Sequence, residues 1–338
     1  MCEQEIILHK IAKVIAELWL KDNKHLIRLF LEKNYNFSFF IMQLVNMIKE
    51  QENRSRKIEK ILSSGKINFE VLTEITGLDR IVTVSVSINS FSRTRLKLLD
   101  RFFISQKMFK KLNLKYIGNH EFFEKELYKL LYRYSTLWQY QSFLAEENLL
   151  LFKEELECSL ECFSCPLYRV YDNYCSMFEE DKVFGSFGDF FKFQLVRDYE
   201  IKNQYLPMLE GPTSEEPKTI ELCMELNPPY ISEIVDKTID KIIELITVDG
   251  AFCFILTIPD WFLDKIPKLY EKGLSIIEIH PERINFTLYT KHFQKINYYK
   301  TSVTILIIRN KKGELRYPVT ETFIQRLIDI NKTTSTSH

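Results

Sequence analysis

Short apolar segments alternate with helical ones in the second half of the chain, and this alternation most strongly constrains the fold. Six segments are apolar enough to be strands: residues 156–163, 220–226, 252–258, 275–279, 286–289 and 303–308. Helical spacing of apolar residues is found between several of them. Strands that alternate with helices favour a mostly parallel sheet that is covered on both faces. Ligands of such sheets bind beyond the carboxyl ends of the strands.

The first half of the chain is expected to be mainly helical. Apolar residues recur at helical spacing in residues 7–18, 26–49 and 121–147, whereas residues 81–88 alternate apolar and small polar side chains like a half-buried strand. Residues 72–78 also look like a nucleic-acid-binding helix-turn, although this pattern is common in helical hairpins. We therefore predict an α/β protein with a mainly helical RNA-binding or accessory domain at residues 1–148, a second domain at 149–330 and a flexible tail at 331–338.

Composition indicates a folded protein inside the cell. A chain of 338 residues, 46% of them hydrophobic, can bury a full core. The longest uncharged stretch, residues 34–48, is shorter than the roughly 20 apolar residues of a membrane span. The first residues include Glu3 and Glu5 and show no basic leader region, so the seven cysteines are expected to be reduced thiols. We expect a nuclear or cytoplasmic protein that is not secreted and has no membrane contact.

Charge is distributed unevenly, although the formal net charge is zero. Residues 80–140 carry twelve Lys and Arg against four Asp and Glu, and residues 141–182 carry three against ten. A basic block suggests a surface that faces phosphate groups, and we take Arg93, Arg95, Lys97 and Arg101 as candidate RNA-binding residues. Two other interpretations stay open: the basic residues line solvated helix faces, or they pair with the acidic stretch at residues 146–161.

The motif Asn227-Pro228-Pro229-Tyr230 follows an apolar segment and opens a predicted helix at residues 231–246. It suits methyl transfer to the exocyclic amine of adenine, whose lone pair is delocalised into the ring. The Asn227 side-chain oxygen and the Pro228 carbonyl can accept the two N–H bonds of that amine, which favours a pyramidal nitrogen. Proline restricts this backbone before substrate arrives, and Tyr230 offers a flat face for the base.

A plain turn is the alternative interpretation of this motif, because Asn-Pro and Pro-Pro pairs are common in loops. The order of strand, motif, helix and strand favours a site, since residues 252–258 read as the next buried strand.

Five blocks of residues occur in order in the C-terminal half of the chain. The blocks are Glu161-Cys162-Phe163 with Pro166-Leu167, Tyr174-Cys175-Ser176 with Phe178, Phe184-Gly185-Ser186 with Gly188, Asn227-Pro228-Pro229-Tyr230, and Ile258-Pro259-Asp260-Trp261. Together they resemble the phosphorylated-CTD-interacting-factor family, the cap-specific adenosine N6-methyltransferases. The resemblance implies a Rossmann-like methyltransferase core preceded by a helical domain that helps to hold capped RNA. It also implies S-adenosyl-L-methionine as the methyl donor.

The resemblance assigns roles residue by residue. The catalytic residues that it implies are Asn227, Pro228, Pro229 and Tyr230. The cofactor-binding residues that it implies are Glu161, Cys162, Phe163, Pro166, Leu167, Phe184, Gly185, Ser186, Gly188 and Asn227. The two glycines could instead serve a turn, and Trp261 is expected to pack in the core.

Three features depart from the family pattern. Trp19, Trp138 and Trp261 are too far apart to form the WW domain of the family's vertebrate members, so no WW-mediated contact with the polymerase tail is expected. Tyr230 stands where the family favours Phe and keeps the stacking face. Tyr168 stands where the family usually has Asn, which puts one cofactor contact in doubt.

Metal sites and two other functions are the alternatives to this prediction. The spacing of Cys158, Cys162 and Cys165 is that of a four-iron cluster in radical enzymes, but too few residues follow for the usual partial barrel. A zinc site that includes Cys175 lacks a fourth ligand at a standard spacing, so we expect no metal. A catalytically silent RNA-binding scaffold, or an adenine N6-methyltransferase acting on internal RNA or DNA, stays open. The preferred prediction is N6-methylation of the first transcribed adenosine next to the mRNA cap.

Overall fold

The computed structural model describes residues 67–76, 79–89, 96–137, 142–195, 220–289, 293 and 295–332. Contacts divide the chain into two units, one of Met1–Glu70 with Ser85–Arg101 and the other of Val71–Val84 with Phe102–His338. The candidate site lies in the second unit. The predicted helices at residues 7–18 and 26–49 fall outside the described residues, as do residues 333–338 of the predicted tail. The first residue of that predicted tail, Asn331, is instead buried at the end of a helix.

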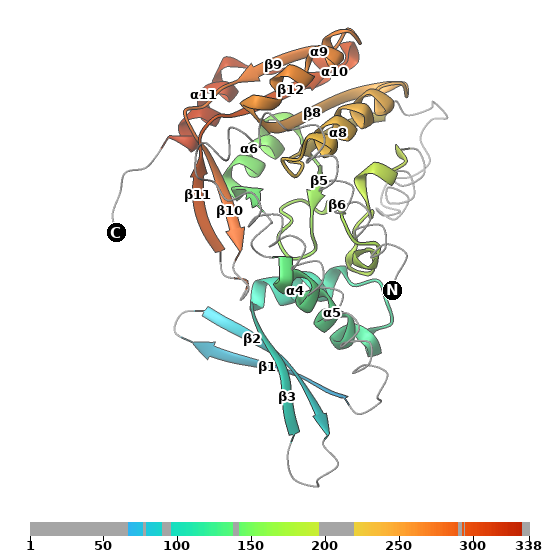
Figure 1. The fold of residues 1–338 in the computed structure, drawn as a ribbon, viewed down its shortest axis with the longest axis vertical. Coiled ribbons are helices and arrows are strands. Elements are labelled where there is room, and N and C mark those ends of the chain that lie inside the picture. Colours follow the sequence, from blue (N-terminus) through green and yellow to red (C-terminus); the bar gives the residue numbers. More distant parts are fainter. Residues whose placement is uncertain are drawn as a thin grey trace, which may run out of the picture. The chain divides into compact units, whose positions relative to one another are not determined.

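A six-stranded sheet forms the centre of the second unit (Figure 1), with the strand order β6-β5-β7-β8-β12-β9. Its strands are β5 (Leu160–Ser164), β6 (Asn173–Ser176), β7 (Ile220–Leu226), β8 (Gly250–Pro259), β9 (Ser275–Ile279) and β12 (Val303–Arg309). Strands β6, β5, β7 and β8 are parallel, whereas β12 runs antiparallel to both β8 and β9. The prediction of a mixed helix and strand protein with a mostly parallel sheet is confirmed.

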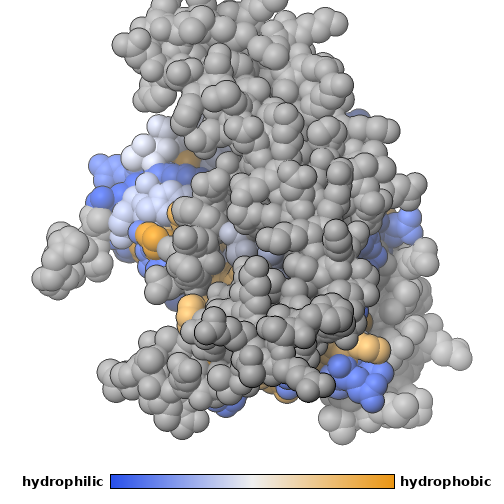
Figure 2. Space-filling model, turned by 60° about the horizontal axis from the view of Figure 1, so that its bottom comes forward, coloured by the Kyte–Doolittle hydropathy of each residue, from blue (hydrophilic) through white to orange (hydrophobic). Residues whose placement is uncertain are grey.

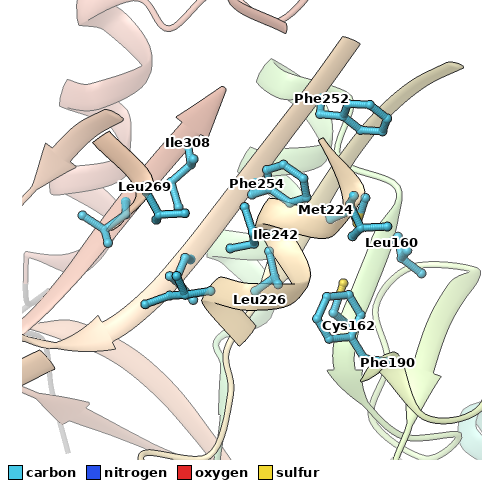
Figure 3. Packing of buried hydrophobic residues seen from close by; sticks show 14 of the residues in the cluster. Leu160, Cys162, Phe190, Met224, Leu226, Ile242, Phe252, Phe254, Leu269 and Ile308 are labelled. Carbon is cyan, nitrogen blue, oxygen red and sulfur yellow. The ribbon is translucent and has the colours of Figure 1, made fainter. Parts of the chain in front are cut away.

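Helices cover both faces of this sheet because its strands are apolar on both sides. On β8, Phe252 and Phe254 point to one face, and Cys253 and Ile255 point to the other. The first face packs against α8 (Ser232–Leu245) and α9 (Pro267–Tyr270). The second packs against α6 (Glu146–Leu156) and α11 (Glu321–Asn331). Figure 3 shows residues of the first face gathered between the strands and α8.

The predicted helix after the motif is confirmed as α8, and the predicted strand at residues 156–163 begins later than expected. Helix α6 continues to Leu156 and ends at Glu157, whose φ of 50° is left-handed, and β5 starts only at Leu160. The apolar residues near position 156 therefore belong to the core face of a helix. A further short helix, α10 (Lys311–Arg316), follows β12 and begins at Asn310, whose side chain accepts the Gly313 N–H at 2.8 Å.

A second, antiparallel sheet of three strands lies beside the candidate site in the fold. Its order is β11-β10-β4, with β4 (Ser142–Leu144), β10 (Ile284–Tyr289) and β11 (Lys295–Lys300). Strand β11 is an edge of this sheet and lies on the outside of the β10–β11 hairpin (Figure 1). Of these strands, only the apolar part of β10 was predicted, because β11 has the polar sequence KINYYK and β4 is only three residues long.

Three strands precede the helices of the first half: β1 (Ile67–Thr76), β2 (Asp79–Asn89) and β3 (Leu96–Ser105) form one sheet. The predicted strand at residues 81–88 is confirmed as β2. The helix-turn interpretation of residues 72–78 is wrong, since β1 runs through residue 76. Helices α4 (Gln106–Lys115) and α5 (Phe123–Leu137) follow, with a short 3-10 turn, η1 (His120–Phe122), between them.

The surface of the described residues is mixed in character. In the view of Figure 2, hydrophilic side chains predominate wherever these residues reach the surface, and hydrophobic ones form small patches. Within the described part of the chain, every helix is too short or too polar to span a membrane.

Candidate functional site

The direction of the strands brings the predicted site segments to one edge of the central sheet. Strands β5, β6, β7 and β8 are parallel, so their carboxyl ends share an edge. From β5 the chain moves to β6 on one side and later returns to β7 on the other, which makes a topological switch point between β5 and β7. Ligands of doubly wound sheets bind in the crevice outside such a point. The segment after β7 begins with Asn227.

Asn227 is held in one orientation by two hydrogen bonds. Its side-chain Nδ2 donates to the backbone oxygen of Ser142 in β4 at 3.0 Å, and its Oδ1 accepts the hydroxyl of Tyr230 at 3.2 Å. The amide nitrogen is therefore occupied on the side of β4. The amide oxygen has two lone pairs, and one of them remains for a further donor.

The backbone after Asn227 turns sharply into helix α8. Pro228 is buried, Pro229 is exposed, and the Pro229 carbonyl accepts the N–H of Ile231 at 2.7 Å. Neither proline has an N–H to donate, so the turn leaves no unpaired backbone donor at these positions. The predicted position of the motif between a strand and a helix is confirmed.

Lys300 lies over the ring of Tyr230. Its Nζ atom is 4.5 Å from the Tyr230 ring centroid and 4.4 Å from that of Phe286, and it donates to the Ser142 Oγ at 3.2 Å. Burial lowers the pKa of Lys300 to about 8. The Ser142 Oγ also hydrogen-bonds to the Tyr298 hydroxyl. An ammonium group thus shares the aromatic surface that the sequence assigned to a base.

Glu161 organises the loop that follows β5. Its Oε1 accepts the backbone N–H groups of Val170 and Tyr171, both at 2.6 Å, and its Oε2 accepts the Ser164 hydroxyl at 2.9 Å. Burial raises the pKa of Glu161, and these hydrogen bonds partly offset that rise. Both carboxylate oxygens are engaged within the loop. The predicted contact between Glu161 and a cofactor stays a prediction, while a role in shaping the loop is evident.

Glu225 is a buried carboxyl group that the sequence prediction missed. It is 4% exposed and pairs in register with Glu161 on the neighbouring parallel strand. Burial raises its pKa well above the usual value, and the nearby Glu161 adds to this rise. Among the described residues, no hydrogen bond to its side chain is found. Its signal in the sequence is a charged residue inside an apolar strand, two positions before Asn227.

Several residues with predicted cofactor roles pack in the core. Cys162 belongs to the apolar cluster under α8, and Pro166 and Leu167 are buried in the loop after β5. Phe163 makes edge contacts with the rings of Phe190 and Phe191, at centroid distances of 5.3 and 5.8 Å. These positions shape the loop beyond β5, and a contact with cofactor stays a prediction.

The second predicted cofactor loop is joined to the end of β6. Gly185 and Gly188 have φ values of 90° and 87°, a left-handed conformation that favours glycine. The Ser186 hydroxyl bonds to the Ser176 hydroxyl at 2.8 Å and accepts the Gly188 N–H at 2.9 Å. Both glycines therefore adopt turn conformations, and their contact with a cofactor stays a prediction.

The outer end of this loop is anchored on the helices of the first half. Phe184 is buried against the rings of Tyr116 and Phe123, and its carbonyl accepts the Tyr174 hydroxyl at 2.8 Å. Phe184 is thus a packing residue in this structure.

Trp261 is exposed, which corrects the prediction that it packs in the core. It is 64% exposed and directly follows Asp260 at the carboxyl end of β8. The 3-10 turn η6 (Asp260–Lys265) instead directs Phe262 into the core, where it is 8% exposed. A turn of this kind places neighbouring side chains on different sides.

The basic block is partly engaged inside the second unit. Lys115 pairs with Asp172 at 3.0 Å, and Arg133 pairs with Asp181 at 2.9 Å. The acidic stretch at residues 146–161 pairs instead with Arg316 and Arg326 near the C-terminus. The candidate RNA-binding residues are not tested by these contacts. Arg93 and Arg95 lie outside the described residues, and the side chains of Lys97 and Arg101 are not described.

The cysteines behave as buried thiols. Cys158, Cys162, Cys165 and Cys175 are all buried, and burial raises the pKa of the Cys162 and Cys165 thiols. Within the described ranges, no group of three or more His, Cys, Asp and Glu side chains is arranged to hold a metal ion.

Comparison with known proteins supports the family resemblance. A family model described as "Phosphorylated CTD interacting factor 1 WW domain" matches residues 105–207. The match includes the blocks around Glu161, Tyr174 and Gly185 and ends before Asn227. No curated protein matches the chain.

The name of this family model bears on one expectation. Because the name includes a WW domain, the expectation that no WW-mediated contact with the polymerase tail occurs is not supported. The matched segment contains one tryptophan, Trp138. The described residues of the same segment include helices α4, α5 and α6 and the parallel strands β5 and β6.

Proposed function

We propose that the chain is an S-adenosyl-L-methionine-dependent methyltransferase that acts on the exocyclic amine of adenosine in RNA, at the first transcribed adenosine next to the cap. The observation that carries this proposal is the geometry of Asn227. Its amide nitrogen is bound to the Ser142 carbonyl at 3.0 Å, at the switch point of a doubly wound sheet. The amide oxygen is thereby presented as an acceptor at the place where such sheets bind ligands.

Asn227 and Pro228 would act on the amine of the base. Each carbonyl oxygen accepts one N–H of the amine, which withdraws its lone pair from the ring and directs it toward the methyl donor. Because the Asn227 side chain and the two prolines are already fixed, little reorganisation accompanies binding. The methylated amine then loses its extra proton to water, so no protein base is required.

The residues at the end of β5 and β7 suit the proposed cofactor. S-adenosyl-L-methionine supplies the methyl group as a sulfonium and also carries a cationic amino group. Glu225, a buried carboxyl group with no hydrogen-bond partner among the described residues, matches that amino group in charge and hydrogen bonding. It lies two residues before Asn227, about 7 Å along an extended chain. The loop held by Glu161 would border the same space.

A methyl-transfer assay with labelled cofactor tests the proposal. The substrates are capped and uncapped RNAs that begin with A, and matched capped RNAs that begin with G. We expect label in N6-methyladenosine from the capped A-RNA alone, and a loss of about 100- to 1000-fold in Asn227→Ala. RNA binding without any transfer would instead indicate a catalytically silent scaffold. Transfer to internal adenosines or to DNA would indicate the alternative function, an adenine N6-methyltransferase that acts on internal RNA or DNA.

Recruitment through the polymerase tail is a further part of the proposal. The matching family is named for interaction with a phosphorylated CTD. Binding of phosphorylated and unphosphorylated CTD peptides to the full chain tests it. Equal or absent binding of the two peptides would contradict this contact without affecting the methyltransferase proposal.

A further inference from the structure

We infer that strand β11 and its neighbour Arg283 form a docking surface for the single-stranded RNA that leads into the Asn227 site. This β11 surface follows the edge of the strand: Arg283, Lys295 and Tyr299 lie on one face, and Tyr298 and Lys300 lie on the face that also carries Phe286. The inference rests on the proposed function, since it specifies how the RNA substrate would be held. It concerns residues other than the basic block at residues 80–140.

The β11 surface combines cations with one exposed aromatic ring, Tyr299, and one half-buried ring, Tyr298. Tyr299 is 43% exposed, and Lys295 is exposed at the start of the strand. Neither β10 nor β11 contains an aspartate or glutamate. Exposed aromatic rings interleaved with basic residues are typical of surfaces that bind single-stranded nucleic acid, where bases stack and cations meet phosphates.

The cations of this surface are placed beside its rings. The guanidinium of Arg283 lies 5.2 Å from the Tyr299 ring centroid, and the Nζ of Lys300 lies 5.7 Å from that of Tyr298. Within the described part of the chain, neither Lys295 nor Lys300 forms an ion pair with a carboxylate. A partly buried ammonium without an anionic partner is costly, and a phosphate group would supply that partner.

The face of β11 that carries Tyr298 and Lys300 reaches the candidate site. Lys300, at the end of β11, contacts the Tyr230 ring at 4.5 Å and the Ser142 Oγ at 3.2 Å. Ser142 in turn accepts the amide of Asn227 through its backbone oxygen. From Lys295 to Lys300 an extended strand spans about 17 Å, the length of roughly five stacked nucleotides. An RNA bound along β11 would therefore end beside the motif.

Charge decides between the possible occupants of this edge strand. An unpaired edge can also add a strand from a peptide or from a second copy of the chain. Such pairing depends on backbone hydrogen bonds and does not require the cations or the cation–ring pairs. Strand β11 carries two lysines, and neither β10 nor β11 carries an acid, which favours a polyanion; the proximity of Asn227 favours RNA.

Binding of a labelled single-stranded RNA of twelve nucleotides, measured by fluorescence anisotropy at several salt concentrations, tests the inference. The variants are Lys295→Glu, Tyr299→Ala and Lys300→Met. The matched control is Lys272→Glu, an exposed lysine just before β9. Strand β9 runs parallel to β8, so its start lies at the edge of the sheet opposite the site.

We expect each lysine variant to bind RNA more weakly and to reduce the salt slope by about 0.7 for each phosphate group that is no longer neutralised. Tyr299→Ala should weaken binding about 5- to 150-fold, the effect of one stacked base. Lys272→Glu should bind like wild type. All variants should keep the melting temperature and the affinity for S-adenosylhomocysteine of wild type.

Two results would overturn the inference. One is wild-type RNA affinity and salt slope in all three β11 variants. The other is a dimer in sedimentation that Tyr299→Ala converts to monomer, which would assign the edge to a second copy. Failure of the proposed function is distinguishable, because RNA binding through β11 without methyl transfer would leave this inference intact. If the three β11 variants bind RNA and transfer methyl groups like wild type, the proposed function stands and the β11 inference fails.

Discussion

The substitution Asn227→Asp separates two accounts of the motif. Aspartate keeps an acceptor for the adenine amine, so a motif that needs only an acceptor would tolerate it. In this structure the Asn227 Nδ2 also donates to the Ser142 carbonyl at 3.0 Å. A carboxylate cannot donate, and two oxygen atoms would then face each other in a partly buried site. We therefore expect loss of activity at neutral and higher pH.

The magnitude follows from the hydrogen bond that the substitution removes. A net hydrogen bond contributes about 1 kcal/mol, and a buried acceptor left unsatisfied costs about 1–3 kcal/mol more. If only the ionised form of the introduced aspartate is destabilised by this total of about 2–4 kcal/mol, its pKa rises by about 1.5–3 units. That pKa would then lie at about 5.5–7. The protonated acid can donate to Ser142 again, so activity is present below this range and is lost as pH rises through it.

Single-turnover methyl transfer between pH 5.5 and 8.5 measures this effect. We expect Asn227→Asp to be about 100- to 1000-fold slower than wild type at pH 8 and to recover toward pH 5.5. The matched control is Asn119→Asp. Asn119 accepts the Glu121 N–H at 3.0 Å, which aspartate does equally well. The reasoning would be refuted by a variant that transfers methyl groups within threefold of wild type at pH 8 with an unchanged melting temperature.

Three further predictions concern the surroundings of the site. Burial raises the pKa of Asp181 from 3.8 to about 6, so its native carboxyl binds the proton more tightly than the unfolded one. Protonated Asp181 therefore contributes its full stabilisation below pH 3.8, and this contribution is lost as pH rises through about 6. In urea unfolding, the free energy of unfolding of wild type should fall by about 2 kcal/mol between pH 4.5 and 7.5, relative to that of Asp181→Asn. Tyr230→Phe removes one hydrogen bond and keeps the ring, so kcat should fall less than about tenfold in a steady-state transfer assay with KM for RNA unchanged; a rise in KM as large as that of Tyr230→Ala would contradict this. Dialysis against a metal chelator should leave the transfer rate unchanged, and activity that returns only on adding iron or zinc would revive the cysteine-cluster interpretation.

Burial on both faces made the central strands predictable from the sequence. Strand β7 was predicted with its observed bounds, Ile220–Leu226, and the strand predicted at residues 303–308 ends one residue before β12 does. In a sheet covered by helices each strand is a short, nearly continuous apolar run, and polar or turn residues mark its ends. The motif at Asn227 was located in the same way, because it follows such a run and precedes an amphipathic helix.

One-sided or exposed strands were not predictable in this way. The sequence of β11, KINYYK, has no apolar run because its residues are exposed or only half-buried, and β4 is too short to show a period. Residues 72–76 were assigned to a possible helix-turn because a short apolar pattern fits either helix or strand until its neighbours are known. Pairing with β2 decided that question in the fold.

The sequence alone determined the central strands and the position of Asn227, Pro228 and Tyr230 between a strand and a helix, since these depend on residue type and on neighbours along the chain. Only the tertiary structure decided how the Asn227 side chain is oriented. Ser142 lies 85 residues from Asn227 and 158 residues from Lys300, yet it hydrogen-bonds to both. The pairing of β4 with β10 places it there. Such contacts arise from strand pairing between distant segments, and no local spacing in the sequence encodes them.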